Sequence, residues 1–137
     1  MQTKIIVKTT VNTPIKKVWE FWTNPNHVMH WNHASDDWHT PNAENDLSVG
    51  GKFSYTMAAK DGSFSFDFWG TYTRIIEHEM LVIKLGDDRN LEITFTSDVD
   101  KTHITEIFDA ENENPVELQQ TGWQAILDNF KKYTESI

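Results

Sequence analysis

Residues 114–137 read NPVELQQTGWQAILDNFKKYTESI, and this stretch decides how the rest of the chain can fold. Apolar side chains recur in it every three or four residues, which is the spacing of one face of an α-helix. They are Val116, Trp123, Ile126, Leu127 and Phe130, with polar residues such as Gln124 and Asp128 on the opposite face. The pattern predicts an amphipathic helix of roughly 20 residues, about 30 Å long, at the end of the chain.

Proline directly after a good N-cap residue indicates where helices begin, because the first helical N–H needs no partner. Three such pairs occur: Thr13-Pro14, Asn24-Pro25 and Asn114-Pro115. Glu117, three residues after Asn114, completes a start that is similar to a capping box. We therefore expect the long helix to begin after Asn114, and two short N-terminal helices at about 14–22 and 25–30.

Most of the remaining chain alternates apolar and polar residues with the period of two that is typical of β-strands. Asp61-Gly62 predicts a hairpin, because a tight turn of this kind needs positive φ. Gly70, inside a long strand, predicts a bulge or a bend. The expected strands are Thr3–Val11, Lys52–Ala58, Phe64–Ile76, Met80–Leu85, Leu91–Thr96 and Thr102–Ala110, with a poorly defined strand or loop near Asp37–Ala43.

This order of elements predicts the fold class. One helix cannot cover both faces of such a sheet, so the sheet has to curl around it. We expect an α+β fold in which a curved antiparallel β-sheet is wrapped around the long C-terminal α-helix, with two short N-terminal helices. A curled sheet around one helix tends to leave an apolar cavity between them, which is the usual setting of a small-molecule site.

Length and composition narrow the classes of function. At 137 residues, the chain is expected to form a single domain over 1–137. It has no cysteine, which excludes disulfides and thiolate chemistry, and no apolar run long enough for membrane insertion. The net charge of −9 argues against nucleic-acid partners, which need a basic patch. The first residues read as a strand and not as a signal peptide, so we expect a cytoplasmic location.

Tryptophan and histidine concentrate between Trp19 and His39, a segment that holds four of the six tryptophans and four of the six histidines. Both side chains combine an apolar body with a polar tip. Two interpretations stay open: the tryptophans fill the core and the histidines lie on loops, or the segment lines one side of a ligand cavity. The ligand-binding candidates that follow from the second interpretation are Trp31, His33 and Trp38, with Tyr55 and Trp123 from the sheet and the long helix.

Two carboxylates interrupt apolar strand faces. Glu106 lies between Ile104 and Phe108 on one face of its strand, so it enters the cavity if that face points inward. An unpaired buried charge is too costly, so a buried Glu106 is expected to have a raised pKa and to be the main polar anchor of the cavity. The alternative turns the opposite face, with His103, inward. Asp67 poses the same question, since it either points to solvent or shares the pocket.

Gly122 interrupts the long helix, at a cost of up to about 1 kcal/mol relative to alanine. It either lets the helix pack closely on the sheet or leaves a gap between them.

Metal and cofactor sites are not indicated. His27, His30 and His33 recur at three-residue spacing, and two of them with Asp36 or Asp37 would supply zinc ligands, but the spacing fits known zinc patterns poorly. No Gly-rich phosphate loop and no nucleophile motif occurs in the sequence. We expect neither a metal nor a cofactor.

Several short motifs, in order along nearly the whole chain, resemble those of one family. They are Pro14-x-x-x-Val18-Trp19-x-x-Trp22-Thr23-x-Pro25, Trp31, Trp38, Gly50-Gly51-x-Phe53, Gly70-x-Tyr72-x-x-Ile75, Thr102-x-Ile104-Thr105, Phe108 and Gly122-Trp123-x-x-x-Leu127. The chain resembles a START-like, helix-grip protein of the SRPBCC superfamily and, within it, the activator of heat-shock protein 90 ATPase homologues. The resemblance implies the same helix-grip fold as the order of elements does.

The resemblance implies less about function, because the superfamily includes binders, cyclases, dehydratases and co-chaperone domains. We expect the chain to bind a small hydrophobic molecule, aromatic or lipid-like, between the sheet and the C-terminal helix. One alternative is a cyclase- or dehydratase-like enzyme with Glu106, Asp67 or a histidine as general acid or base. Another is a protein-interaction module that acts on a chaperone. We expect a monomer or a homodimer.

Overall fold

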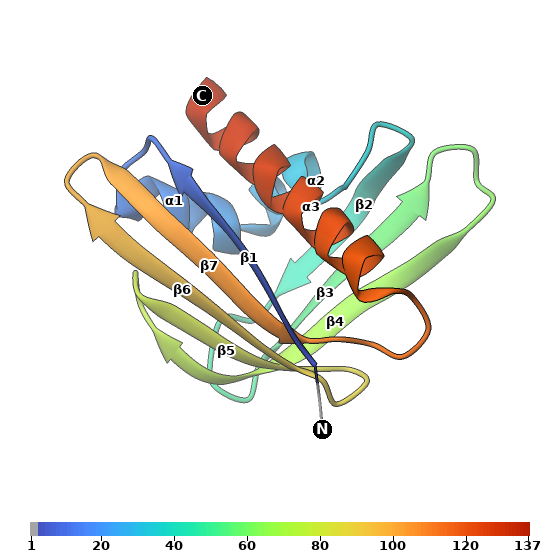
Figure 1. Cartoon of the computed structure of the whole chain (residues 1–137). Helices are drawn as coiled ribbons and strands as arrows, with labels where there is room; N and C mark the ends of the chain where they lie inside the picture. Colours follow the sequence, from blue (N-terminus) through green and yellow to red (C-terminus); the bar gives the residue numbers. More distant parts are fainter. Residues whose placement is uncertain (1–2) are drawn as a thin grey trace.

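One antiparallel sheet curves around the C-terminal helix, as the computed structural model of the chain shows for residues 3–137 (Figure 1). The strands are β1 Lys4–Val11, β2 Trp38–Asn45, β3 Lys52–Ala59, β4 Ser65–Ile76, β5 Met80–Leu85, β6 Asn90–Asp98 and β7 Lys101–Asp109. The helices are α1 Ile15–Thr23, α2 Pro25–Trp31 and α3 Val116–Ser136. The predicted α+β helix-grip architecture is confirmed.

The strand order is β1-β7-β6-β5-β4-β3-β2, and every neighbouring pair is antiparallel. The first strand therefore joins the last one, which leaves β1 and β2 as the two edges of the sheet. Along β7, buried residues alternate with more exposed ones, and the buried residues point to the concave face. They are Thr102, Ile104, Glu106 and Phe108. The inward orientation predicted for Glu106 is confirmed, and the alternative with His103 inward is wrong.

The helix α3 is tied to the open edge of β1. Three of its side chains donate hydrogen bonds to alternate backbone carbonyls of that strand. These bonds run from Gln120 Nε2 to Ile6 (3.2 Å), from Gln124 Nε2 to Lys8 (3.1 Å) and from Lys131 Nζ to Thr10 (2.7 Å). The bonds give partners to carbonyls that an edge strand otherwise leaves exposed. They also place α3 along one side of the sheet.

The C-terminal half of α3 packs into an aromatic core. Leu127 and Phe130 are completely buried, as predicted. The ring of Phe130 lies edge-on to Trp22 of α1 and Trp31 of α2, with centroids 4.8 and 4.9 Å away. Trp123 was predicted to be buried, but it is only partly buried, because its ring lines a hollow under the N-terminal half of the helix.

The helix starts differ in part from the prediction. Asn24 caps α2, and its side chain accepts a hydrogen bond from the Asn26 N–H at 2.9 Å. Pro14 and Pro115 themselves occupy the N-cap positions of α1 and α3, without a side-chain cap. The predicted capping box at Asn114 was therefore wrong. The Asn114 side chain instead donates to the Glu111 carboxylate, because the loop before α3 folds back on itself.

The bend predicted at Gly70 lies a little further along β4, where the register shifts between Tyr72 and Arg74. Gly70 keeps its register but has another role. A Cβ there would lie 2.7 Å from the Ile83 side chain and 3.0 Å from the Phe53 ring, so only glycine lets these side chains come so close. The hairpin expected at Asp61-Gly62 is confirmed, and Gly62 has a φ of +79°. Within residues 3–137, no helix is long and apolar enough to cross a membrane.

The burial of α3 predicts the effect of truncation. Leu127→Ala should lower the free energy of unfolding by about 3–5 kcal/mol, because it removes a fully buried side chain and leaves a cavity. Leu118→Ala on the same helix is the matched control, since Leu118 is 58% exposed, and its cost should stay below about 1 kcal/mol. Urea denaturation of the two variants measures both values. Equal losses would contradict the packing described.

Candidate ligand-binding cavity

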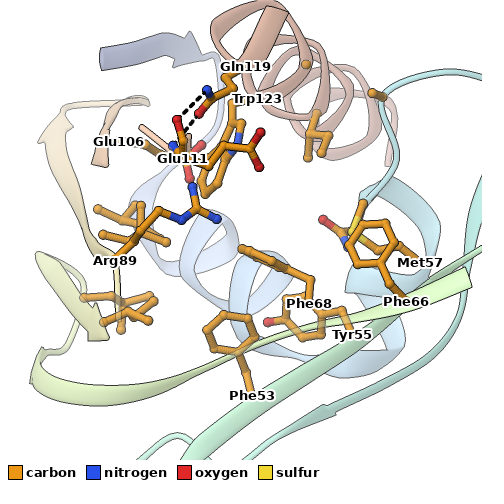
Figure 2. Close-up of a pocket in the computed structure, with 18 of the residues that line it drawn as sticks. Phe53, Tyr55, Met57, Phe66, Phe68, Arg89, Glu106, Glu111, Gln119 and Trp123 are labelled. Atoms are coloured by element: carbon orange, nitrogen blue, oxygen red, sulfur yellow. Dashed lines mark hydrogen bonds between the residues drawn. The ribbon is translucent and has the colours of Figure 1, made fainter. Parts of the chain in front are cut away.

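A cavity of about 370 Å³ lies between the N-terminal half of α3 and the concave face of the sheet (Figure 2). Most of its lining is aromatic or aliphatic. These residues are Trp22, Trp31, Phe53, Tyr55, Met57, Phe66, Phe68, Tyr72, Leu81, Ile83, Leu91, Ile93, Leu118, Trp123 and Ile126. Phe66 and Leu118 are 43% and 58% exposed, so the cavity reaches the surface where they lie. The volume is in the range of small-molecule sites.

Gly122 accounts for part of this space. It lies inside α3 and lines the cavity, and a Cβ built on it would meet nothing within 4 Å. A glycine required for close packing would have neighbours at that distance. Of the two interpretations of Gly122, the structure therefore supports the gap between helix and sheet.

Trp123 connects α3 to two strands of the sheet. Its ring stacks on Phe108 of β7, with centroids 3.8 Å apart, and meets Phe68 of β4 edge-on at 5.8 Å. Aromatic rings of β7 and β4 thus fix the orientation of the indole. One face of the cavity is consequently a rigid aromatic surface.

Glu106 projects from β7 into this apolar space and is only 5% exposed. Its cross-strand neighbours are Val7 and Ile93, and both are buried. Within residues 3–137, no side chain or backbone group forms a hydrogen bond or an ion pair with its carboxylate. Burial raises the pKa of Glu106 to about 8, because the charged form loses its hydration and gains no partner. The raised pKa predicted from the sequence is confirmed, and the carboxyl is mainly neutral at pH 7.

Other polar residues gather at the same end of the cavity as Glu106. Gln119 is buried and holds the loop between β7 and α3: its Oε1 accepts from the Glu111 N–H at 2.9 Å, and its Nε2 donates to the Asn114 carbonyl at 2.8 Å. Arg89 donates from Nε to Asp87 at 2.7 Å and lines the rim. Figure 2 shows Arg89, Glu106, Glu111 and Gln119 together, far from Met57 and Phe66.

Two tyrosines that line the cavity form hydrogen bonds with other protein groups through their hydroxyls. The Tyr72 hydroxyl donates to Asn45 Oδ1 at 2.7 Å and is hydrogen-bonded to Tyr55. Burial raises the pKa of both phenols, so they stay neutral. Both hydroxyls therefore already have hydrogen-bond partners, and the rings present apolar surface to the cavity.

The structure brings four of the seven predicted site residues to the cavity lining: Trp31, Tyr55, Glu106 and Trp123. Asp67 faces away from it, on the exposed side of β4, and accepts a hydrogen bond from Thr56 Oγ at 2.8 Å. Trp38 lies outside the lining, at the start of the edge strand β2. Its ring packs against those of Phe64 and Phe66, with ring centroids 6.2 Å apart in both pairs. The placement of Trp38 in the cavity lining was therefore wrong.

His33 also lies outside the lining, beside the C-terminal half of α3. Asn129 Nδ2 donates to its Nε2 at 3.0 Å, and burial lowers the pKa of the imidazole. His27 Nδ1 lies 2.8 Å from the Tyr133 hydroxyl, and the ring of His30 stacks on Tyr133 at 5.7 Å. These histidines hold α2 against α3. In the described part of the chain, no three His, Asp or Glu side chains are grouped as a metal site.

Sequence reasoning missed Arg89, Gln119 and the aromatic pair Phe53 and Phe68 as parts of the lining. Phe53 lies two residues before Tyr55 on β3, so both side chains share one face of the strand. The prediction that Tyr55 lines the cavity could therefore have been extended to Phe53. Arg89 and Gln119 carry no such signal, because a turn and the first turns of a helix bring them to the cavity only in three dimensions.

Comparison with known proteins places this geometry in a family. A sequence model described as "Activator of Hsp90 ATPase homolog 1-like protein" matches residues 12–135. The solution structure of the AHSA1-like protein from Aeromonas hydrophila is 44% identical and has a TM-score of 0.91, over 98% of this chain and 93% of that chain. Chr148 from Cytophaga hutchinsonii is 53% identical, with a TM-score of 0.84, over 97% and 92%. No protein of curated function matches the chain.

The pKa of Glu106 predicts a pH-dependent effect of Glu106→Gln. Because the folded pKa lies above the unfolded value, the stability from this carboxyl is fully present below about pH 4.3 and is lost as the pH rises through about 8. Glu106→Gln should therefore gain stability over the wild type as the pH rises from 5 to 9, on the order of 4 kcal/mol at most. Urea denaturation at several pH values measures this.

Glu92→Gln is the matched control, because Glu92 lies on the neighbouring strand β6 and on the opposite face from Glu106. Because Glu92 does not line the cavity, this variant should lack the gain in stability that Glu106→Gln shows between pH 5 and 9. If the stability difference between Glu106→Gln and the wild type also stayed constant from pH 5 to 9, the Glu106 carboxyl would not be desolvated as described.

The open space at Gly122 predicts that Gly122→Ala stabilises the protein by up to about 1 kcal/mol, since alanine favours the helix and meets no neighbour. Gly70→Ala should do the reverse, because its Cβ would lie 2.7 Å from Ile83. Thermal or urea denaturation distinguishes the two. Destabilisation by Gly122→Ala would show that α3 lies closer to the sheet.

Proposed function

The chain belongs to the Activator of Hsp90 ATPase homolog 1-like family, and we propose that it binds a small hydrophobic molecule, aromatic or lipid-like, in the cavity under α3. The observation that carries the proposal is the unfilled space itself. A core closes around its side chains at high packing density, so a hollow of about 370 Å³ is not a by-product of folding.

The lining favours an apolar and partly aromatic ligand. Trp31, Phe68 and Trp123 present ring faces and edges to the cavity, and each is held by contacts to other rings or to the backbone. Such rings bury large apolar areas at little cost in side-chain entropy, because they are already ordered. In this proposal Tyr55 completes the floor and Glu106 is the polar anchor.

A cyclase- or dehydratase-like activity has less support. Glu106 is a buried carboxyl of suitable pKa for proton transfer at neutral pH. However, none of the histidines is among the residues that line the cavity in the described chain, and Asp67 lies on the exposed face. Arg89 and Glu111 also line the cavity, but both already form hydrogen bonds within the protein, so the arrangement fits binding better than catalysis.

Binding can be tested with N-phenyl-1-naphthylamine, a neutral aromatic probe. Gly122→Leu should weaken its binding at least tenfold without loss of stability, because the new side chain enters open space in the cavity. The wild type should gain about 2.7 kcal/mol of stability at a probe concentration of 100 times Kd. Probe fluorescence and thermal denaturation provide the two readouts.

Thr121→Leu is the matched control, since it adds the same side chain to an exposed position next to Gly122 on α3. It should leave the affinity unchanged. If the wild type did not bind the probe, or if both leucine variants bound it as the wild type does, the cavity would not be the ligand site.

A further inference from the structure

The cavity has two chemically different ends. The aromatic end, at Met57, Phe66 and Phe68 of the β3–β4 hairpin, carries no charged group. The opposite end, under the first turns of α3, holds Glu106 and, at its rim, Arg89 (Figure 2). The ligand that binds such a cavity most favourably is apolar along most of its length and carries its polar group at one end.

At the polar end, Gln119 and Arg89 already form hydrogen bonds within the protein. The Gln119 amide uses both its oxygen and its nitrogen on the loop before α3. The Arg89 guanidinium donates to the Asp87 carboxylate and, at 3.2 Å, to the Asp109 carbonyl. The Glu106 carboxyl differs from both, because within residues 3–137 it has no partner although it is 95% buried. A ligand atom that pairs with this carboxyl supplies the hydrogen bond that the protein itself does not provide.

Charge at this end disfavours an anionic ligand. Arg89, whose Nε donates to Asp87, lines a neighbouring surface pocket together with five carboxylates, and the whole chain has a net charge of −9. They are Asp87, Asp88, Asp109, Glu111 and Glu113. A carboxylate or a phosphate on the ligand would meet this field and would also lose its hydration beside the apolar wall.

A cationic ligand is disfavoured for a different reason. It would need Glu106 to ionise between Val7, Ile93, Ile104 and Phe108, where no donor stabilises the charge. Burying an ion pair in such surroundings costs more than burying a neutral hydrogen bond of the same geometry. A neutral carboxyl, in contrast, has an O–H to donate and needs an acceptor.

We propose that the cavity selects an uncharged ligand with an apolar, ring-containing body and a single terminal hydrogen-bond acceptor, a carbonyl or ether oxygen, which accepts the proton of the neutral Glu106 carboxyl. This inference rests on the proposed function and specifies its ligand class. The acceptor lies at the β7 end, and the apolar body extends under Trp123 towards Phe66.

Four naphthalenes of similar size test this selection: 2-acetylnaphthalene, 2-isopropylnaphthalene, 1-(2-naphthyl)ethylamine and 2-naphthoate. The quantity measured is the ratio of ketone to hydrocarbon affinity, by calorimetry at pH 6. Glu106→Leu should lower this ratio about tenfold, which is the loss of one hydrogen bond of about 1.4 kcal/mol. Glu106→Gln should keep it, since the amide N–H also donates. Glu92→Gln is the control on the opposite face of the sheet and should also keep it.

The pH dependence gives a second readout that a purely structural role of Glu106 would not produce. In the wild type, the ratio should fall as the pH rises through about 8, because the ionised carboxylate has no proton to donate. In Glu106→Gln the ratio should be constant over that range. Binding of the hydrocarbon serves as the check that each variant keeps a folded, open cavity.

The outcomes separate this inference from the proposed function. A ratio unaffected by Glu106→Leu, or tightest binding of the amine or the naphthoate, overturns the inference but leaves a hydrophobic cavity that binds ligands. If none of the four compounds bound the wild type, both the proposed function and its ligand class would fail.

Discussion

The attachment of α3 to the edge of β1 is the constraint on which the rest of the structure depends. Three hydrogen bonds from Gln120, Gln124 and Lys131 to alternate β1 carbonyls hold the helix along that edge. The aromatic contacts of Phe130 then fix its C-terminal half. The N-terminal half contacts the sheet through Trp123 and leaves the space beside that ring unfilled. Gly122 adds no side chain to fill the gap, and the cavity is the result.

The same arrangement explains why one carboxyl dominates the chemistry of the cavity. The antiparallel pairing of β7 with β1 and β6 surrounds Glu106 with buried aliphatic side chains and leaves the cavity as its open direction. Gln119, which is also buried, is neutral and forms its hydrogen bonds with the loop before α3. Desolvation thus acts on Glu106 without compensation, and the site combines an apolar volume with a buried carboxyl that has no partner within residues 3–137.

Much of this could be predicted from the sequence, because periodicity reports which residues share a face. The spacing of Leu127 and Phe130 gave the buried stripe of α3, and the alternation along β7 turned Glu106 inward. Periodicity does not report where an irregular segment goes. Trp38 begins an edge strand whose register shifts between His39 and Asn42, so its ring lies outside the cavity. Arg89 enters the rim through a turn between β5 and β6, which no local pattern indicates.

A ¹³C NMR titration of the Glu106 side-chain carboxyl tests most directly whether a neutral carboxyl lies without a partner in an open apolar cavity. We expect a single midpoint near pH 8. A midpoint at or below about 4.3, the value of an unperturbed glutamate, would contradict it, because the group would then be hydrated or paired and could not select an uncharged acceptor.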